Sequence, residues 1–281
     1  MKLAQALNSA RDTLAQKDIE DASLEAEILL RHTLKIDRTQ LYLDFEKELN
    51  PEDEKAFEAL ITRRLKGEPS AYIIGHREFY GRDFYVNAHT LIPRPESELL
   101  VETALRTVKE RQLHTIADIG TGCGAIAITL ALEIPNAKIY ATDLSAKALE
   151  VAEVNCKRHG ADGVRLLQGD MLEPLPEPVD LIAANLPYVQ RAEIAPDNFE
   201  PLLALDGGAK GTEMIARLCR QAKGKLKDDG SMLLEVGQGQ SGAITGLLHH
   251  LFPSGITEVL PDLGGIERVA SLNLSEAKVA G

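Results

Sequence analysis

A short polar motif, Asn185-Leu186-Pro187-Tyr188, follows an apolar run at residues 179–184. The Asn185 side-chain oxygen can accept one N–H of a planar NH₂ group, and the backbone carbonyl of Leu186 can accept the other. Pro187 stiffens the segment, and the ring of Tyr188 can cover the flat face of the group. The motif therefore predicts a pocket that holds an amide or an exocyclic amine nitrogen. The alternative is a plain turn, because Asn and Pro are also turn formers.

A glycine-rich turn stands earlier in the chain, between an expected strand and an expected helix. It reads Asp118-Ile119-Gly120-Thr121-Gly122-Cys123-Gly124-Ala125. Glycines let the backbone approach a ligand, and the helix N-terminus behind them favours negative charge. Gly120, Gly122 and Ala125 nearly satisfy the dinucleotide-binding fingerprint, whereas Gly120, Gly122 and Gly124 satisfy the G-x-G-x-G form of methyltransferases. Asp118 before the turn favours the methyltransferase form, and a tight turn without a ligand is the remaining alternative.

Two acidic residues follow the next two expected strands. Asp143 comes after the strand at 138–142 and can accept hydrogen bonds from both hydroxyls of a ribose, which NAD and S-adenosylmethionine share. Asp170 follows the strand at 164–168 and could accept from an adenine amino group, with Met171 packing on the ring. Asp170 could equally cap the following turn. These positions predict a nucleoside ligand without choosing between the two cofactors.

Taken with the Asn-x-Pro-Tyr motif, the glycine turn predicts methyl transfer from S-adenosylmethionine to a planar nitrogen. Such a nitrogen is a poor nucleophile because its lone pair is delocalised. Positioning must therefore supply much of the rate, and in ideal intramolecular models it contributes up to ~7–11 kcal/mol. No strong general base is required, since the proton becomes acidic as the methyl group transfers.

The elements that position these motifs alternate after residue 115. Strands are expected at 115–119, 138–142, 164–168, 179–184 and 231–236, helices at 125–133, 146–159, 213–226 and 242–251, and further β-prone runs at 256–259 and 268–273. Strands separated by helices of this length imply parallel βαβ units, so we expect an α/β fold with a doubly wound, Rossmann-like sheet. Ligands of such sheets bind outside the carboxyl ends of the strands, where the motifs lie.

The first part of the chain has a different pattern. Apolar residues recur at helical spacing up to about residue 75, which predicts a small N-terminal helical domain over 1–75. β-prone residues around Gly81-Arg82-Asp83 predict a hairpin within a linker over 76–95. A helix should then begin at Glu96, at the start of a methyltransferase domain over 96–281. We expect its tail, 275–281, to be frayed.

Composition narrows the class of partner. The net charge of −12 argues against a large nucleic-acid footprint, which would need a basic surface. Three widely spaced cysteines do not suggest a disulfide framework, and the histidines form no cluster with ligand spacing, so we expect no metal. The first residues lack an apolar signal segment and no run is long enough to span a membrane. We therefore expect a reduced, cytoplasmic and monomeric protein that binds neither DNA nor a membrane.

Several stretches resemble one known family, the HemK/PrmC enzymes. The resemblance spans nearly the whole chain and is carried by residues 72–81, 92–98, 118–124, 185–188, 200–208 and 233–240. The stretches Ile-Pro-Arg-Pro-Glu at 92–96 and Glu-Pro-Leu-Leu-Ala-Leu-Asp-Gly-Gly at 200–208 are more specific than the glycine turn. HemK/PrmC enzymes methylate the side-chain amide of a glutamine in bacterial peptide chain release factors.

The resemblance implies a class I methyltransferase that converts S-adenosylmethionine to S-adenosylhomocysteine. It implies cofactor contacts at Gly120, Thr121, Gly122, Cys123, Gly124, Asp143 and Met171, beside those expected at Asp170 and Asn185. Asn185, Leu186, Pro187 and Tyr188 would hold the glutamine of a Gly-Gly-Gln loop, with Asn185, Pro187 and Tyr188 as the catalytic set. The helical domain would help to dock the protein substrate. Arg94 and Glu96 could touch ligand or brace the linker, and we favour bracing.

One position departs from the family pattern. The usual motif is Asn-Pro-Pro-Tyr, and Leu186 replaces its first proline. The change is mild, because the position contributes a backbone carbonyl, but the Leu form also occurs in enzymes that dimethylate adenine in ribosomal RNA. Methylation of an exocyclic amine of adenine in RNA or DNA is therefore the alternative function. A third hypothesis is a protein that keeps the fold and binds the cofactor without catalysis. The intact Asn-x-Pro-Tyr motif argues against it.

Overall fold

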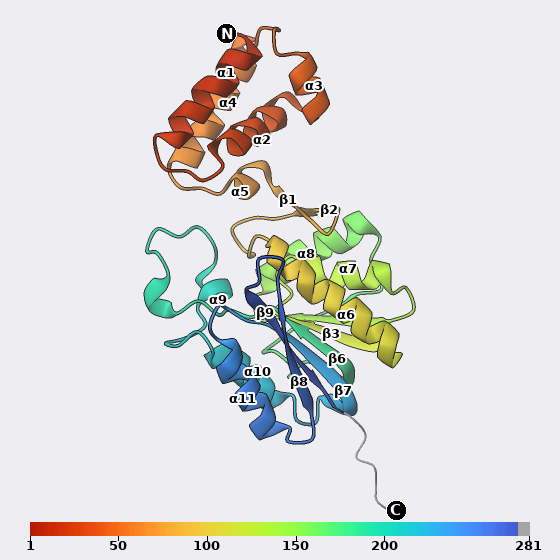
Figure 1. The fold of residues 1–281 in the computed structure, drawn as a ribbon. Coiled ribbons are helices and arrows are strands. Elements are labelled where there is room, and N and C mark those ends of the chain that lie inside the picture. Colours follow the sequence, from red (N-terminus) through yellow and green to blue (C-terminus); the bar gives the residue numbers. More distant parts are fainter. Residues whose placement is uncertain (275–281) are drawn as a thin grey trace, which may run out of the picture. The chain divides into compact units, whose positions relative to one another are not determined.

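A computed structural model describes residues 1–274 of the protein (Figure 1). The expectation of a frayed tail at 275–281 lies outside these residues. The chain divides into two compact units: the first comprises Met1–His76 with Asp197–Phe199, and the second comprises Arg77–Pro196 with Glu200–Gly281. Among the described residues, no helix combines the length and apolar character that a membrane span requires.

The first unit is helical, as the sequence predicts. Its helices are α1 (Leu3–Ala15), α2 (Ala22–Leu34), α3 (Arg38–Leu43), α4 (Pro51–Leu65) and α5 (Ser70–Ile74). α4 begins with Pro51 in its first turn, and the Asn50 side chain accepts from the backbone N–H of Asp53 at 2.8 Å, both of which favour a helix start. A core of aliphatic side chains and Phe57 holds the helices together. The short α3 had no clear sequence signal.

The predicted hairpin is present. It consists of β1 (His76–Phe79) and β2 (Arg82–Tyr85). Its turn is Tyr80-Gly81, one residue earlier than predicted, and both residues have positive φ values of 52° and 68°, which a two-residue hairpin turn favours. The helix expected from Glu96 starts as the 3₁₀ turn η1 (Pro95–Ser97) and continues as α6 (Glu98–Arg111).

The second unit contains a seven-stranded sheet in the order β5-β4-β3-β6-β7-β9-β8. Its strands are β3 (Thr115–Ile119), β4 (Lys138–Asp143), β5 (Arg165–Gln168), β6 (Val179–Ala184), β7 (Leu226–Glu235), β8 (Ile256–Pro261) and β9 (Glu267–Asn273). β5, β4, β3, β6 and β7 pair in parallel, which confirms the doubly wound α/β prediction. β9 runs antiparallel between β7 and β8.

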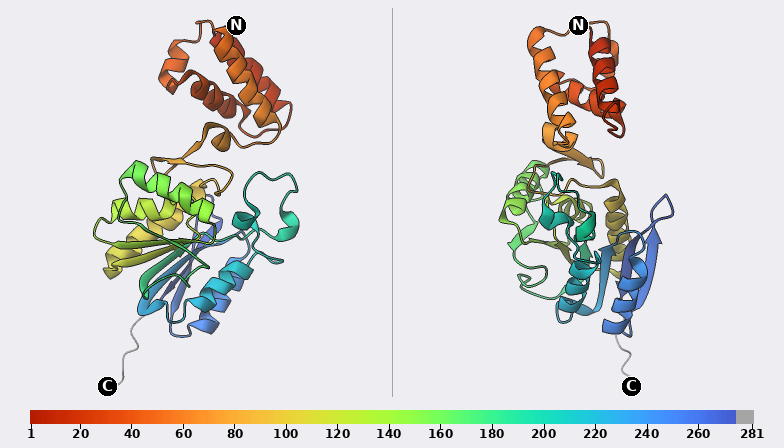
Figure 2. Two further views of the ribbon diagram at one scale, coloured as in Figure 1. Left: turned by 180° about the vertical axis from the view of Figure 1, so that it is seen from behind. Right: turned by 90° about the vertical axis from the view of Figure 1, so that its left-hand side faces the viewer.

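Helices cover both faces of this sheet (Figure 2). α6, α7 (Ala125–Glu133) and α8 (Ala146–His159) pack side by side on one face, and α10 (Glu213–Gln221) and α11 (Ser241–Leu251) pack on the other. The short helices η2 (Arg191–Glu193) and α9 (Leu202–Leu205) lie in the long connection after β6. The prediction of a helix to residue 226 is wrong: α10 ends at Gln221, and β7 begins at Leu226 after a turn that contains Gly224 with φ +79°.

Candidate active site

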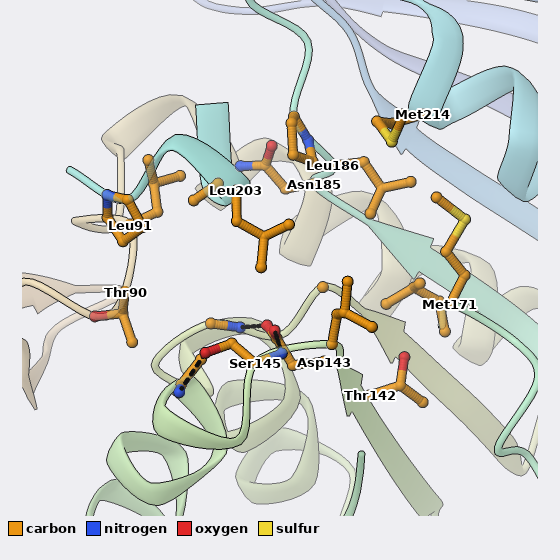
Figure 3. A pocket seen from close by; sticks show the side chains of 18 of the residues that line it. Thr90, Leu91, Thr142, Asp143, Ser145, Met171, Asn185, Leu186, Leu203 and Met214 are labelled. Atoms are coloured by element: carbon orange, nitrogen blue, oxygen red, sulfur yellow. Dashed lines mark hydrogen bonds between the residues drawn. The ribbon is translucent and has the colours of Figure 1, made fainter. Parts of the chain in front are cut away.

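A pocket opens at the carboxyl ends of the central strands, as expected for a doubly wound sheet. Its walls come from the ends of β3, β4 and β6, the residues after β5, the segment before η1, and the connection around α9 and α10 (Figure 3). The predicted site residues among its lining are Gly120, Gly122, Asp143, Asp170, Met171, Asn185, Leu186 and Pro187. The structure thus brings together residues from four separate strand ends.

The glycine turn forms the floor of this pocket. Gly120, Gly122 and Gly124 all have positive φ values, 74°, 56° and 85°, so alternate residues take a conformation that side chains resist. The amides of Gly120 and Thr121 both donate to the carbonyl of Thr142, at 2.9 Å each. The side chains of Thr121 and Cys123 are buried and, like Gly124, do not line the pocket. The loop therefore presents its backbone to the pocket, mainly at Gly120 and Gly122.

A buried carboxyl supports the turn from below. Asp118 is 1% exposed, and its Oδ2 accepts from the Thr121 hydroxyl at 2.6 Å and from the Ala127 amide at 3.1 Å. Its Oδ1 has no hydrogen-bond partner among the described residues. Burial raises the pKa of Asp118 to about 7, against the two hydrogen bonds, which lower it. Asp118 therefore braces the loop and does not face the pocket.

A second brace, Asn155 on α8, was not predicted. Its Nδ2 donates to the carbonyl of Cys123 at 2.8 Å and to the carbonyl of Tyr85 at 2.9 Å, while its Oδ1 accepts from the Tyr85 amide at 2.7 Å. Asn155 is fully buried and lies on the same helix stripe as Ala148, Val151 and Ala152. A polar residue on an apolar stripe was the available signal. Asn155 therefore links the glycine turn to the end of the β1–β2 hairpin through hydrogen bonds.

Asp143 at the end of β4 is anchored by backbone donors. Its Oδ2 accepts from the Gly122 amide at 2.9 Å and its Oδ1 from the Ser145 amide at 2.8 Å (Figure 3). Burial raises the pKa of Asp143, and these N–H groups oppose the shift. Each carboxylate oxygen retains a further lone pair, so Asp143 can still accept from two hydroxyls of a ligand in the pocket.

The other predicted acid, Asp170, has protein partners of its own. Its Oδ2 pairs with the guanidinium of Arg217 and accepts from Gln221 at 3.1 Å. Asp170 and Arg217 both line the pocket, with Met171 beside them. An adenine amino group would therefore meet a carboxylate that already holds a structural ion pair, a feature that the sequence did not show.

The Asn-x-Pro-Tyr motif leaves the end of β6 along the pocket wall. Asn185 donates from Nδ2 to the Ser97 hydroxyl at 2.8 Å, which directs its side-chain oxygen away from Ser97. Leu186 is buried, and a Cβ atom on Gly120 would lie 3.0 Å from its Cδ2. The residue that departs from the family pattern thus packs on the glycine turn. Its side chain leaves free the Asn185 side-chain oxygen and the Leu186 carbonyl, the two predicted hydrogen-bond acceptors.

Tyr188 lies on the other side of the motif and lines a neighbouring pocket with Gly237 and Gln240. Its hydroxyl donates to Oε1 of Glu235 at 3.3 Å, and its carbonyl accepts from Nε2 of Gln240 at 2.8 Å. Burial, followed by the charge of Glu235, raises the pKa of Tyr188 to about 12. Tyr188 therefore stays neutral near pH 7.

The stretch at 200–208 supports the motif by close backbone contact. The amide of Gly207 donates to the carbonyl of Val189 at 2.9 Å. A Cβ atom on Gly207 would lie 2.7 Å from Tyr188 Cα and 2.8 Å from the carbonyl oxygen of Pro187, so only glycine fits there. Glu200 pairs with Arg94 and accepts from the Ile92 amide at 2.9 Å. Arg94 therefore braces the chain before η1.

The structure also reveals two site residues that sequence analysis missed, Ser97 and Glu235. Both lie inside stretches that carry the family resemblance, yet their partners, Asn185 and Tyr188, come from the distant Asn-x-Pro-Tyr motif. Between residues 1 and 274, no group of three or more His, Cys, Asp or Glu side chains could hold a metal ion. The three cysteines are free and buried.

Comparisons with known proteins agree with this arrangement. The family model for the PrmC N-terminal domain matches residues 5–75, and the methyltransferase small domain matches residues 95–254. Release factor glutamine methyltransferase of Moorella thermoacetica is 41% identical over 95% of this chain and 97% of its own length. The Bordetella pertussis protein of the same name is 43% identical over 88% of this chain and 93% of its own length.

A solved structure supports the fold alone. The ribosomal protein L11 methylase of Lactobacillus delbrueckii subsp. bulgaricus matches 68% of this chain and 84% of its own, at 21% identity and a TM-score of 0.51. The two curated relatives match over nearly the full length of both chains, across the helical domain and the methyltransferase domain alike. The chain therefore belongs to the HemK/PrmC family of release factor glutamine methyltransferases.

Proposed function

We propose that the protein transfers a methyl group from S-adenosylmethionine to the side-chain amide nitrogen of the glutamine in the Gly-Gly-Gln motif of peptide chain release factors. The observation that carries this proposal is the orientation of Asn185. Its amide nitrogen is held by Ser97 at 2.8 Å, which leaves its oxygen to accept an N–H from an acceptor molecule. Family membership supports a glutamine amide as that acceptor.

The pocket residues fit S-adenosylmethionine. Asp143 has lone pairs left for the two ribose hydroxyls, and the backbone at Gly120 and Gly122 can approach the cofactor because no side chain intervenes. Met171 would pack on the adenine, and Asp170 would face its amino group. When bound, S-adenosylmethionine supplies an electrophilic methyl group on a sulfonium.

The chain's own residues then act by positioning. Asn185 Oδ1 and the Leu186 carbonyl would accept the two N–H groups of the glutamine amide, which fixes its plane. Pro187 limits movement of the backbone at Leu186, the residue before it, and Tyr188 would cover one face of the amide. No base is needed, because the nitrogen-bound proton becomes acidic as the new bond forms and can be released to water. Tyr188 keeps its own proton near pH 7.

The helical unit would dock the release factor. Tyr42 and Leu43 on α3 are 48% and 75% exposed, and Leu24 on α2 is 49% exposed. Large apolar side chains exposed on a small helical unit are suited to contact with a protein partner. We propose that the enzyme acts as a monomer in the cytoplasm, where its substrate is made.

Methylation of adenine in RNA is the alternative hypothesis, and its only support is that Leu186 replaces the usual proline. The Leu186 side chain packs toward Gly120, so it alters the loop contact without changing the two acceptors. Of the charged residues in the pocket lining, Asp143 and Asp170 are acidic, and Arg217 pairs with Asp170. A pocket with this charge is poorly suited to a nucleic-acid backbone.

The test uses labelled methyl donor with purified release factor, followed by mapping of the label. We expect label on the glutamine of Gly-Gly-Gln and none on a release factor in which that glutamine is replaced by alanine. Label on RNA alone would contradict the proposal. In the enzyme, Asn185→Ala should abolish transfer and leave cofactor affinity, measured by calorimetry, largely unchanged. A collapse of that affinity would contradict the role given to Asn185.

A further inference from the structure

A buried carboxyl stands behind the proposed acceptor site and has no part in the mechanism above. Glu235, the last residue of β7, is 1% exposed. Its Oε1 accepts from the Tyr188 hydroxyl at 3.3 Å, and its Oε2 is buried without a hydrogen-bond partner in the part of the chain that the structure describes. Burying a carboxyl costs free energy, so its retention at this position calls for a role.

Ser97 is hydrogen-bonded to Asn185 and lies near this carboxyl. Ser97 is 3% exposed, and its oxygen accepts from Asn185 Nδ2 at 2.8 Å. Burial raises the pKa of Glu235, and the hydroxyls of Ser97 and Tyr188, together with Arg268, act against that rise by favouring the carboxylate. Ser97 therefore contacts Asn185 directly and lies close enough to the Glu235 carboxyl to favour its charged form.

The direction of these contacts is set by the chemistry of the groups. A serine hydroxyl has one proton to donate, and a carboxylate can only accept. If Ser97 gives its proton to Glu235, it can only accept from Asn185. The Asn185 amide must then turn its NH₂ toward Ser97 and its oxygen toward the pocket. Without this constraint, either end of a side-chain amide could face the pocket, since the two ends have the same shape.

We propose that Ser97 and Glu235 are positioning residues that fix the polarity of the Asn185 amide, so that the site accepts an N–H donor and rejects a carboxylate. This inference rests on the proposed function. A glutamine amide offers the hydrogen-bond donors that Asn185 Oδ1 requires, whereas a glutamate side chain offers only acceptors. The pair would thus make the enzyme discriminate glutamine from glutamate in its substrate.

Two variants test this polarity. Ser97→Ala removes the hydroxyl that orients the amide. Glu235→Gln keeps shape and burial but removes the negative charge that attracts the serine proton, so the Ser97 hydroxyl can donate to Asn185 and accommodate the flipped amide. For both variants we expect kcat with the release factor to fall about 10- to 100-fold, with cofactor affinity unchanged. Ser97→Thr retains the hydroxyl and should restore most of the rate.

The decisive measurement uses a release factor whose Gly-Gly-Gln glutamine is replaced by glutamate, as a competitive inhibitor. Wild-type enzyme should bind it weakly, because two oxygen atoms would face each other. Ser97→Ala and Glu235→Gln should bind it about tenfold more tightly, since a flipped amide presents its NH₂ to the carboxylate. A general loss of structure would weaken inhibition, so tighter inhibition separates lost polarity from lost folding.

Matched controls come from residues that lie away from the pocket. Ser271→Ala removes another serine hydroxyl that is 3% exposed, on β9. Asp180→Asn makes the same carboxyl-to-amide change on β6, about 16 Å along the strand from Asn185; Asp180 accepts from the amides of His114 and Thr115. Both controls should keep the wild-type rate and the wild-type preference for glutamine.

The outcomes distinguish this inference from the function on which it rests. Wild-type enzyme that leaves the release factor unlabelled counts against the proposed function. Wild-type enzyme that labels it, together with Ser97→Ala and Glu235→Gln variants that keep the wild-type rate, counts against the positioning role. Slow variants whose inhibition by the glutamate form is unchanged or weaker also overturn it, because Ser97 and Glu235 would then only support the local structure.

Discussion

The contacts of Asn155 lead to a quantitative prediction about the cofactor loop. Asn155→Ala removes three hydrogen bonds at once, two to Tyr85 and one to the carbonyl of Cys123. It leaves the amide and carbonyl of Tyr85 and the carbonyl of Cys123 without these partners in a buried region. At about 1 kcal/mol net for each bond, the loss is roughly 3 kcal/mol in the free energy of unfolding, and the cavity left behind adds to it.

The same substitution should weaken cofactor binding, although Asn155 does not line the pocket. If release of the Cys123 carbonyl makes the ordered loop less favourable by about 1.4 kcal/mol, the apparent affinity for S-adenosylmethionine falls about tenfold. Urea unfolding measures the first effect and titration calorimetry the second. Both measurements use the full-length chain.

A neighbouring substitution provides the control. Cys156→Ala, one residue along α8, removes a buried side chain with no side-chain hydrogen bond described for it. It should lower the free energy of unfolding by less than Asn155→Ala and leave cofactor affinity unchanged. An Asn155→Ala protein with wild-type affinity would refute the reasoning, because the glycine turn would then hold its conformation without help from α8.

Three further predictions concern the loop and the motif. Burial raises the pKa of Asp118 to about 7, above its unfolded value, so its contribution to stability is present at low pH and lost as the pH rises through 7. Measured by urea unfolding and relative to Asp118→Asn, the free energy of unfolding of the wild type should fall by roughly 2–3 kcal/mol between pH 5 and pH 8. A difference between the two proteins that stays constant with pH would contradict this pKa. Asp143→Ala should lower cofactor affinity by about 10- to 100-fold, seen by calorimetry, since it removes a charged partner of the ribose and the anchor of the Gly122 amide. Gly207→Ala should abolish methyl transfer with cofactor affinity retained, because its Cβ atom would lie 2.7 Å from Tyr188 Cα, and normal transfer would show that the motif backbone can shift freely.

Much of this fold follows from local pattern in the sequence. The bounds of α7 and α8 agree with prediction, since apolar spacing and flanking glycines mark both helices clearly. The antiparallel direction of β9 was not predictable, because strand direction depends on packing between distant segments. The end of α10 was missed because Ala222, Lys223 and Leu226 are compatible with helical spacing, although Gly224 among them is typical of a helix end.

The site residues likewise fall into a group that the sequence predicts and a group that it does not. Gly120 and Asn185 each follow a strand and Asp143 ends one, so topology alone brings them to one edge of the sheet. Ser97 and Glu235 gain their roles only from tertiary contacts, and neither residue type at its position is unusual. The ion pair of Asp170 with Arg217 likewise joins residues 47 positions apart in the sequence, which no local pattern can reveal.

The place of β9 has a consequence for how the domain assembles. β8 precedes β9 in the chain, yet β9 pairs with β7 and β8 lies outside it. β8 therefore cannot join the sheet until β9 has docked, and the two strands should add to β7 together as a preformed hairpin. Before that step, β7 offers an open edge with apolar side chains, a typical starting point for aggregation. Substitutions in β9 should therefore reduce the yield of folded protein more than they reduce the activity of the molecules that fold.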